Sequence, residues 1–341
     1  MTHDSATADR GNDIIYARTR EGFDLPVIDV TNPHFTVPDN PAALQRAIDA
    51  FVAEERRRRR IPKFIMRLML RAAARRSRLI RALFHSQAGY LDSLSTYVLK
   101  LGADNLVPPY DSPMDRRIAA SAHMVARLRM QQVARLLAEG LASDLAAVDV
   151  AAPLRLINIG GGPALDSINA LIVLRQSHPD LLSRPIGIDV LDANTDGFFF
   201  GANALAALKA GQSPLAELDV RMYHHDYNWD DPGPLERLVA KLVSAGAVVA
   251  ASTEGALFEY GSNEAIIANL KALRASGAGA RLVAGSVTVA DDLRRRMIAE
   301  TRFKLYPRGV AGFAPLAAAA GYRVVKAEPA LLSEQVLLRP S

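Results

Sequence analysis

The spacing of hydrophobic and polar positions changes near residue 153, and the change divides the chain into two regions. Four segments before it have the apolar spacing of helices: residues 41–60, 64–83, 90–101 and 114–141. Five short β-rich runs follow it, each separated from the next by a helical segment: residues 154–159, 185–190, 220–225, 247–251 and 281–287. Strands and helices that alternate at these lengths form a parallel sheet with helices on both faces.

The last two β-rich runs, residues 321–328 and 334–338, lie only a few positions apart. No crossover helix fits between them, so they must pair antiparallel. We therefore predict an α/β fold, a Rossmann-like seven-stranded sheet with an antiparallel C-terminal hairpin, preceded by an all-helical N-terminal domain. The predicted division is a helical cap or dimerisation domain over residues 1–145 and an α/β domain over residues 146–341. The first ~35 residues are polar with several prolines, and we expect a flexible arm or one ordered by contact.

The composition excludes several kinds of site. There is no cysteine among the 341 residues, which rules out disulfides, thiolate nucleophiles and cysteine-ligated zinc. No apolar run reaches the roughly 18 residues of a membrane-spanning helix. The polar N-terminal residues lack the apolar core of a secretory signal. We expect a cytoplasmic protein with no transmembrane segment.

Positive charge is concentrated in one segment. Residues 54–81 carry twelve arginines and lysines against two glutamates, a net charge of +10, whereas the whole chain carries +5. A solvated arginine face is the ordinary interpretation of such a run. An anionic partner for residues 56–81, such as a membrane, nucleic acid, an acidic carrier protein or acidic helices of the same chain, remains open. Aromatic residues are few and no RNA-binding module accompanies the run, so we expect no nucleic-acid substrate.

A glycine-rich passage is the clearest candidate for ligand chemistry. Gly160, Gly161 and Gly162 lie between the first predicted strand and the helix that follows it. Glycines allow a sharp turn and a close approach of the backbone to a ligand, and the helix N-terminus offers unpaired N–H groups. A glycine-rich turn can also serve packing alone, so its place relative to other polar groups matters.

Two acidic residues end the next two predicted strands. Asp189 lies at the end of the second strand, and Asp226 follows the third. Open α/β sheets bind ligands in the crevice at the carboxyl ends of neighbouring strands, and an acid on the second strand can accept hydrogen bonds from ribose hydroxyls. The sequence therefore predicts one nucleotide-binding crevice formed by the glycines and these two acids.

The glycine passage resembles motif I of the class I S-adenosylmethionine-dependent methyltransferases, which has the pattern acid-x-G-x-G-x-G. Asn158, Gly160, Gly162 and Ala164 fill its four places. Asn158 and Ala164 depart from the pattern. Asparagine in place of the acid weakens the usual polar contact with the methionine end of the cofactor, whereas the family commonly tolerates alanine at the last place.

The resemblance extends from this passage to the end of the chain and implies roles for further residues. It implies S-adenosylmethionine as the cofactor and Asp189 as the acid that binds its ribose. It assigns the adenine amino group to Asp226, with Tyr227 as the adjoining aromatic. The C-terminal hairpin matches the strand that this family inserts antiparallel between its fifth and sixth strands.

The segment after the fourth predicted strand matches the loop that faces the methyl donor in that family. Ser252 is expected to contact the cofactor. Glu254 is a candidate base or acceptor-orienting group, and Tyr260 is a candidate for lining the acceptor pocket. Both residues have a second interpretation, in which Glu254 binds the loop backbone and Tyr260 packs. We expect no metal, because the adjacent residues His224 and His225 point to opposite faces of a strand.

These features predict an enzyme that methylates a small molecule by in-line transfer, in secondary metabolism, and that forms a homodimer. Two other interpretations remain. A nicotinamide-dependent oxidoreductase would need a glycine where Leu165 stands, because the dinucleotide fingerprint is G-x-G-x-x-G. A non-catalytic protein that binds S-adenosylmethionine or another nucleotide is compatible with the departures at Asn158 and Ala164.

Overall fold

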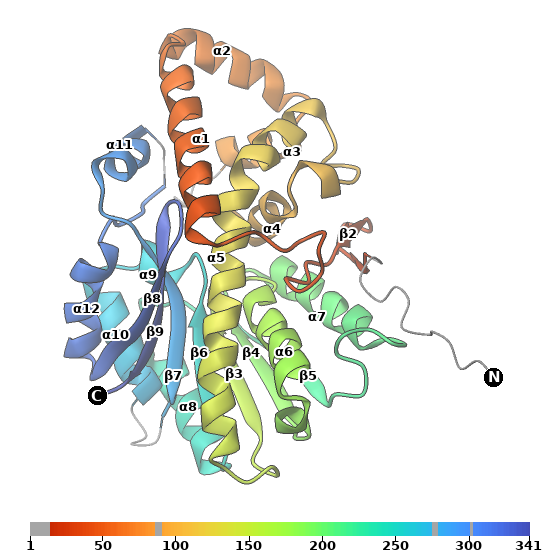
Figure 1. Cartoon of the computed structure of the whole chain (residues 1–341), viewed down its shortest axis with the longest axis vertical. Helices are drawn as coiled ribbons and strands as arrows, with labels where there is room; N and C mark the ends of the chain where they lie inside the picture. Colours follow the sequence, from red (N-terminus) through yellow and green to blue (C-terminus); the bar gives the residue numbers. More distant parts are fainter. Residues whose placement is uncertain (1–13, 86–90, 275–278, 301–302) are drawn as a thin grey trace.

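The chain folds around one large sheet with helices on both faces (Figure 1). The structure, a computed structural model, describes residues 14–85, 91–274, 279–300 and 303–341. The elements before the sheet are β1 (Tyr16–Arg18), β2 (Asp24–Pro26), α1 (Pro41–Arg59), α2 (Lys63–Ala74), α3 (Arg78–His85), α4 (Ser93–Leu101) and α5 (Pro113–Ala146). None of the helices in this described part of the chain combines the length and apolar composition needed to cross a bilayer.

The sheet and its helices occupy the rest of the chain. Its strands are β3 (Leu154–Ile159), β4 (Ile186–Leu191), β5 (Val220–His225), β6 (Val248–Thr253), β7 (Leu282–Thr288), β8 (Tyr322–Pro329) and β9 (Ser333–Pro340). The helices among them are α6 (Leu165–Ser177), α7 (Thr195–Lys209), α8 (Gly233–Ser244), α9 (Leu257–Tyr260), α10 (Asn263–Arg274), α11 (Asp292–Glu300) and α12 (Gly309–Ala319).

The strand order confirms the predicted fold class. The sheet runs β5-β4-β3-β6-β7-β9-β8, with parallel pairing from β5 through to β7. β9 lies between β7 and β8 and is antiparallel to both. The short connection between residues 328 and 334 accounts for the antiparallel pairing of β8 and β9. The last strand of the chain lies next to β7, the fifth strand, as the resemblance to the class I methyltransferases implies.

The carboxyl ends of the parallel strands meet at one edge of a sheet that is largely buried. The strands β3, β4, β6 and β7 are buried on both faces, as the near-continuous apolar runs in their sequences predict. α5, α6 and α7 pack on one face of the sheet, and α8, α10 and α12 pack on the other. The crossovers between parallel strands bring the loops after β3, β4, β5 and β6 to the same edge.

The N-terminal region shares a hydrophobic core with the α/β region. Leu25, Ile28 and Tyr97 belong to the same buried cluster as Leu137 of α5 and Leu156 of β3. For residues 14–37, the structure favours an arm ordered by contact over a flexible one, because side chains from this segment lie in that core. Residues 1–13 of the predicted arm lie outside the described residues. The division into two domains at residue 145 stays a prediction.

One predicted helix is divided in the structure. The apolar spacing over residues 64–83 predicts a continuous helix, but α2 ends at Ala74 and α3 begins at Arg78. Ser77 explains the break: its hydroxyl accepts a hydrogen bond from the backbone N–H of Ile80 and donates one to the Asp115 carboxylate. A serine in this role caps the start of a new helix.

The structure also contains helices that the sequence pattern did not predict. The sequence pattern predicts a helix over residues 201–210, but α7 begins at Thr195, because the Asn194 side chain accepts a hydrogen bond from the backbone N–H of Asp196. α9 and α11 were not predicted. α12 is rich in alanine and buries Phe313 and Ala317 one turn apart against the sheet.

Candidate functional site

Positive backbone angles shape the glycine turn between β3 and α6. Gly160 has φ of 68° and Gly162 has φ of 56°, a region that disfavours side chains. A Cβ on Gly160 would lie 2.8 Å from the Cβ of Ala256, and one on Gly162 would lie 2.5 Å from the Cβ of Ser93. Glycine is therefore required here both for the turn and for the close approach of the neighbouring segments.

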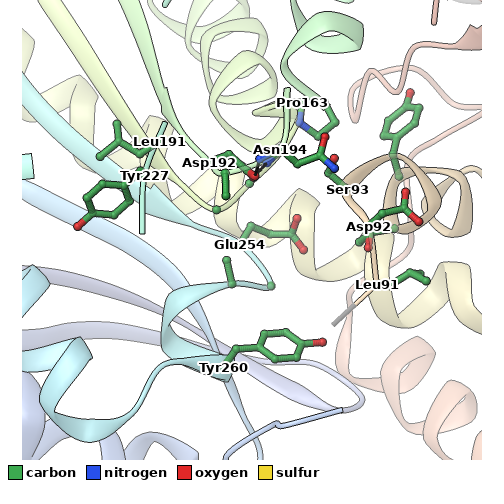
Figure 2. A pocket seen from close by; sticks show the side chains of 18 of the residues that line it. Leu91, Asp92, Ser93, Pro163, Leu191, Asp192, Asn194, Tyr227, Glu254 and Tyr260 are labelled. Carbon is green, nitrogen blue, oxygen red and sulfur yellow. Dashed lines mark hydrogen bonds between the residues drawn. The ribbon is translucent and has the colours of Figure 1, made fainter. Parts of the chain in front are cut away.

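A cavity of about 920 Å³ lies over this turn at the carboxyl ends of the parallel strands. Its size is in the range of small-molecule sites, about 300–1,000 Å³. Its lining includes Gly160, Gly161 and Gly162, Asp192 after β4, Tyr227, Asn228 and Trp229 after β5, Glu254 and Tyr260 near β6, and Ser93, Thr96, Lys100 and Arg129 from α4 and α5. Figure 2 shows Asp192, Glu254 and Tyr260 around it, with Asp92 and Ser93 on the α4 side.

Asp192 is the acidic residue that the second strand of the sheet presents to the cavity. Its carboxylate accepts hydrogen bonds from the backbone N–H groups of Gly162, at 3.1 Å, and Asn194, at 2.8 Å. Burial raises the pKa of this carboxyl above its ordinary value, and the two N–H groups act in the opposite direction. Sequence reasoning missed Asp192. The signal that could have found it is its place between the end of β4 and Asn194, the cap of α7, two residues further on.

Asp189 lies elsewhere. It is in the middle of β4, fully buried, and is not part of the cavity lining. The guanidinium group of Arg155, on β3, donates to both carboxylate oxygens of Asp189, with Nη2 2.6 Å from Oδ1 and Nε 2.9 Å from Oδ2. The Nε2 atom of His225, on β5, lies 2.9 Å from Oδ1 of the same carboxylate. Since an ion pair and a histidine already satisfy this carboxylate, the structure gives it no access to a ribose in the cavity.

The third strand contributes an aromatic group to the cavity, but not the predicted acid. Asp226 is exposed and does not line the cavity, whereas Tyr227 does. The Tyr227 hydroxyl donates to Asn269, 2.5 Å away, and burial raises its pKa. Asn228 and Trp229, which sequence reasoning missed, line the cavity next to Tyr227.

Asn158 and Ser252 lie beneath the glycine turn and do not line the cavity. Both are buried, and the Asn158 amide donates to Asp166, at 2.7 Å, and to Ser252, at 3.1 Å. A Cβ on Gly161 would lie 2.2 Å from the Asn158 side-chain oxygen, so this amide supports the turn from below. Burial raises the pKa of the Asp166 carboxyl that receives its N–H. The two residues shape the turn and are not placed to contact a ligand directly.

Glu254 reaches the cavity as part of a buried ion-pair cluster. Its carboxylate pairs with the ammonium group of Lys100 and the guanidinium group of Arg129, which also lies 3.3 Å from Glu259. Burial alone would raise the pKa of Glu254, but the two cations outweigh burial and hold the pKa below its ordinary value. A carboxylate held in this way is a weak proton acceptor, which counts against Glu254 as a base, and its orienting role stays a prediction.

Tyr260 lines the same side of the cavity. Burial raises the pKa of its hydroxyl to about 12, and the nearby Glu259 carboxylate acts in the same direction. Tyr260 therefore stays protonated at neutral pH and can donate a hydrogen bond.

The described ranges contain no group of three or more His, Asp or Glu side chains that could hold a metal ion. The imidazole of His224 contacts the backbone oxygen of Asp192, and that of His225 contacts Asp189.

No protein-family model and no curated protein matches the chain. Solved structures with a similar arrangement include magnesium protoporphyrin IX methyltransferase (ChlM) from Synechocystis PCC 6803 with bound SAM. It shares 14% identity over 77% of this chain and 96% of that one, with a TM-score of 0.42. The mitomycin 7-O-methyltransferase MmcR shares 14% identity over 68% of this chain and 59% of its own, with a TM-score of 0.38. LepI in complex with SAM shares 14% identity over 59% and 46%, with a TM-score of 0.37.

The match therefore spans about half the length of LepI and about three fifths of MmcR. Likenesses this distant concern the arrangement of the elements and carry no residue roles. The strand order stands on its own observation: five parallel strands, then β9 antiparallel between β7 and β8. This chain has the Rossmann-like seven-stranded fold that its resemblance to the class I methyltransferases implies.

Proposed function

We propose that the protein is an S-adenosylmethionine-dependent methyltransferase that acts on a small molecule. The observation that carries the proposal is the composition of the cavity: the glycine turn after β3, an acid after β4 and an aromatic group after β5 line it together. This is the edge at which open α/β sheets bind nucleotides.

The residues of the cavity fit an adenosyl group. The turn at Gly160 to Gly162 brings backbone rather than side chains to the cavity. Each Asp192 oxygen accepts one backbone hydrogen bond and keeps a lone pair for a ribose hydroxyl. Tyr227 and Trp229 supply apolar surface for a purine ring. We therefore assign to Asp192 the ribose-binding role that the sequence assigned to Asp189.

Bound S-adenosylmethionine would supply an electrophilic methyl group on a sulfonium. The protein's part is to hold the acceptor in line with that group and to exclude water. Glu254 anchors Lys100 and Arg129, and these three side chains with Tyr260 surround the rest of the cavity. The two cations and the Tyr260 hydroxyl are donors that can orient an oxygen-bearing acceptor. A chain-supplied general base is not part of the proposal, because Glu254 is already ion-paired.

The acceptor is a small molecule because of what surrounds the cavity. Ser93 of α4 stands opposite the strand ends (Figure 2), and Thr96 of α4 and Arg129 of α5 line the same cavity. A cavity of about 920 Å³ between these elements holds a nucleoside and a second compound of modest size, and not a folded macromolecule. A role in secondary metabolism and a homodimer stay predictions.

Calorimetry tests the proposal. S-adenosylmethionine and S-adenosylhomocysteine are expected to bind, and NAD is not. Asp192→Asn is expected to weaken binding about tenfold or more, because hydrogen bonds to a charged group contribute about 1.5–3 kcal/mol. Asp226→Asn is the matched control and is expected to leave the affinity unchanged, because this side chain points outside the cavity.

The alternatives give different results. Binding of NAD alone would support an oxidoreductase, and binding of no nucleotide would exclude both enzymes. A loss of affinity in Asp226→Asn but not in Asp192→Asn would restore the acid predicted from the sequence and overturn our assignment. S-adenosylmethionine binding without methyl transfer to any of a broad panel of small acceptors would leave the non-catalytic alternative in place.

A further inference from the structure

The strongest feature that the cavity does not explain is the charge of the helical projection α1–α3. Residues 56–91 contain twelve arginines and lysines and no acidic residue, and the flanking acids are Glu55 and Asp92. The chain as a whole carries +5, so its other residues together carry −7. The molecule is therefore strongly asymmetric in charge, with its positive end in this segment.

This segment is also the part of the fold farthest from the sheet. α1 leads away from the sheet, and α2 crosses the top of the molecule before α3 leads back (Figure 1). α2 packs mainly on α3, and α3 packs on α5. One long side of α2 is left facing solvent.

The solvent-facing side of α2 is apolar over its first half and basic over its second. Phe64 is 73% exposed and Leu68 is 69% exposed, the highest values among the large apolar side chains of the described residues. Ile65 and Met69, one position further round the helix, are exposed as well. Arg71 and Arg75 continue the line of Phe64 and Leu68, because residues three and four apart share one face of a helix. α2 is thus an amphipathic helix whose apolar residues are exposed next to cations.

We propose that α2 binds the surface of an anionic lipid bilayer. Phe64 and Leu68 enter the layer between headgroups and acyl chains, and the arginines of α1 to α3 contact the lipid phosphates. Helices that lie in the bilayer interface combine bulky apolar side chains with a Lys/Arg-rich polar face in this way. The proposal does not depend on the reaction proposed for the cavity.

The same observations disfavour the other occupants. A second copy of the chain, paired symmetrically through α2, would place two strongly basic surfaces against each other, which is unfavourable. A nucleic-acid backbone would be held by the cations but would leave Phe64 and Leu68 without an apolar partner. A bilayer offers both an anionic surface and an apolar interior to one helix face.

Attachment through α2 would bring the cavity close to the membrane. α3 carries Ala82, which lines the cavity, and Leu91 precedes α4 on the same rim. The bilayer-binding helix and the rim of the cavity are therefore parts of one continuous segment of chain. An acceptor dissolved in the membrane would reach the cavity by a short path.

Flotation of the full chain with lipid vesicles tests the proposal. We expect binding to phosphatidylcholine vesicles that contain about one third phosphatidylglycerol, little binding to phosphatidylcholine alone, and weaker binding at high salt. The double change Phe64→Ser/Leu68→Ser is expected to reduce partitioning about tenfold or more, because it removes two apolar side chains from the interface. The double change Arg71→Glu/Arg75→Glu is expected to reduce it at least as much.

Matched controls carry the same changes on other surfaces. Val150→Ser/Val325→Ser replaces exposed apolar residues, and Arg221→Glu/Arg323→Glu reverses exposed arginines. Both are expected to bind vesicles like the unchanged protein, and circular dichroism with thermal melting should show that every variant is folded.

Three results would overturn the proposal. One is no binding to the anionic vesicles, and another is binding that the α2 variants do not weaken. The third is evidence that α2 binds something other than a bilayer, in experiments where the vesicles do not bind. Sedimentation that shows dimers lost in Phe64→Ser/Leu68→Ser would identify a second copy. Binding of a DNA duplex or an acidic protein that only the arginine reversal abolishes would identify a soluble anionic partner.

Discussion

Glu254 holds two cations in a nearly dry environment, and its replacement by glutamine is expected to destabilise the fold substantially. Its side chain is 3% exposed, and those of Lys100 and Arg129 are 9% and 12% exposed. Glutamine preserves the shape but removes the charge. Arg129 would keep Glu259 at 3.3 Å, whereas Lys100 has no second ion pair among the described residues. Removing one partner of a buried pair costs about 3–5 kcal/mol, because the other charge stays buried and uncompensated.

Denaturant unfolding measures this cost. Glu254→Gln is expected to lower the midpoint without changing the slope of the transition, as a pure loss of stability does. Glu236→Gln, on an exposed position of α8, is the matched control and is expected to leave the midpoint unchanged. Lys100→Met/Glu254→Gln is expected to be more stable than the sum of its single changes predicts, because the double change removes the orphaned cation with its partner.

The dependence on pH provides an independent check. Arg129 and Lys100 hold the pKa of Glu254 below its ordinary value of 4.5, despite the opposing effect of burial. A depressed pKa in the folded state contributes stability above about pH 4.5, and that contribution is lost as the pH falls through the folded pKa. The difference between the unchanged protein and Glu254→Gln should therefore be full at pH 7 and narrow on acidification. A difference below about 1 kcal/mol at pH 7, or one that widens in acid, would refute the reasoning.

Two further changes test the glycine turn and the ion pair between Arg155 and the buried Asp189. Gly162→Ala is expected to cost about 1–3 kcal/mol more than Gly211→Ala in chemical denaturation. Both glycines have φ near 56°, but only at Gly162 would the new Cβ meet another residue, and equal costs would show that the contact with Ser93 is unimportant. Arg155→Met is expected to lower the unfolding free energy by about 2 kcal/mol, a value reduced because Arg155 is partly exposed. Arg221→Met, at an exposed position of β5, should change it little, and a similar loss there would refute the role of the Arg155–Asp189 pair.

Much of the sheet could be predicted closely because four of its strands are buried on both faces. Such strands appear in a sequence as compact apolar runs, and the predicted run at residues 154–159 coincides with β3. The predicted run at residues 220–225 coincides with β5, an edge strand that is only partly buried. The antiparallel pairing of β8 and β9 followed from the length of one loop, whereas the place of β9 beside β7 followed from the family resemblance. The break between α2 and α3 could not be predicted in the same way, because it depends on Asp115, which lies 38 residues after Ser77 in the sequence.

The site was predicted less well than the sheet, and the reason lies in how a strand ends. The glycine turn is local, so its sequence was sufficient. Asp189 and Asp192 are three residues apart, and the sequence does not show which of them stands at the edge of the sheet. The register decides it: Asp189 lies opposite Ile157 in the middle of β3, two residue pairs beyond the Arg155 pairing, while β4 continues to Leu191. Arg155 is the residue that makes a buried acid at position 189 tolerable, because an unpaired carboxylate there would be costly. An acid inside a parallel strand therefore predicts a cation on the neighbouring strand. The acid that binds a ligand is to be sought after the strand ends.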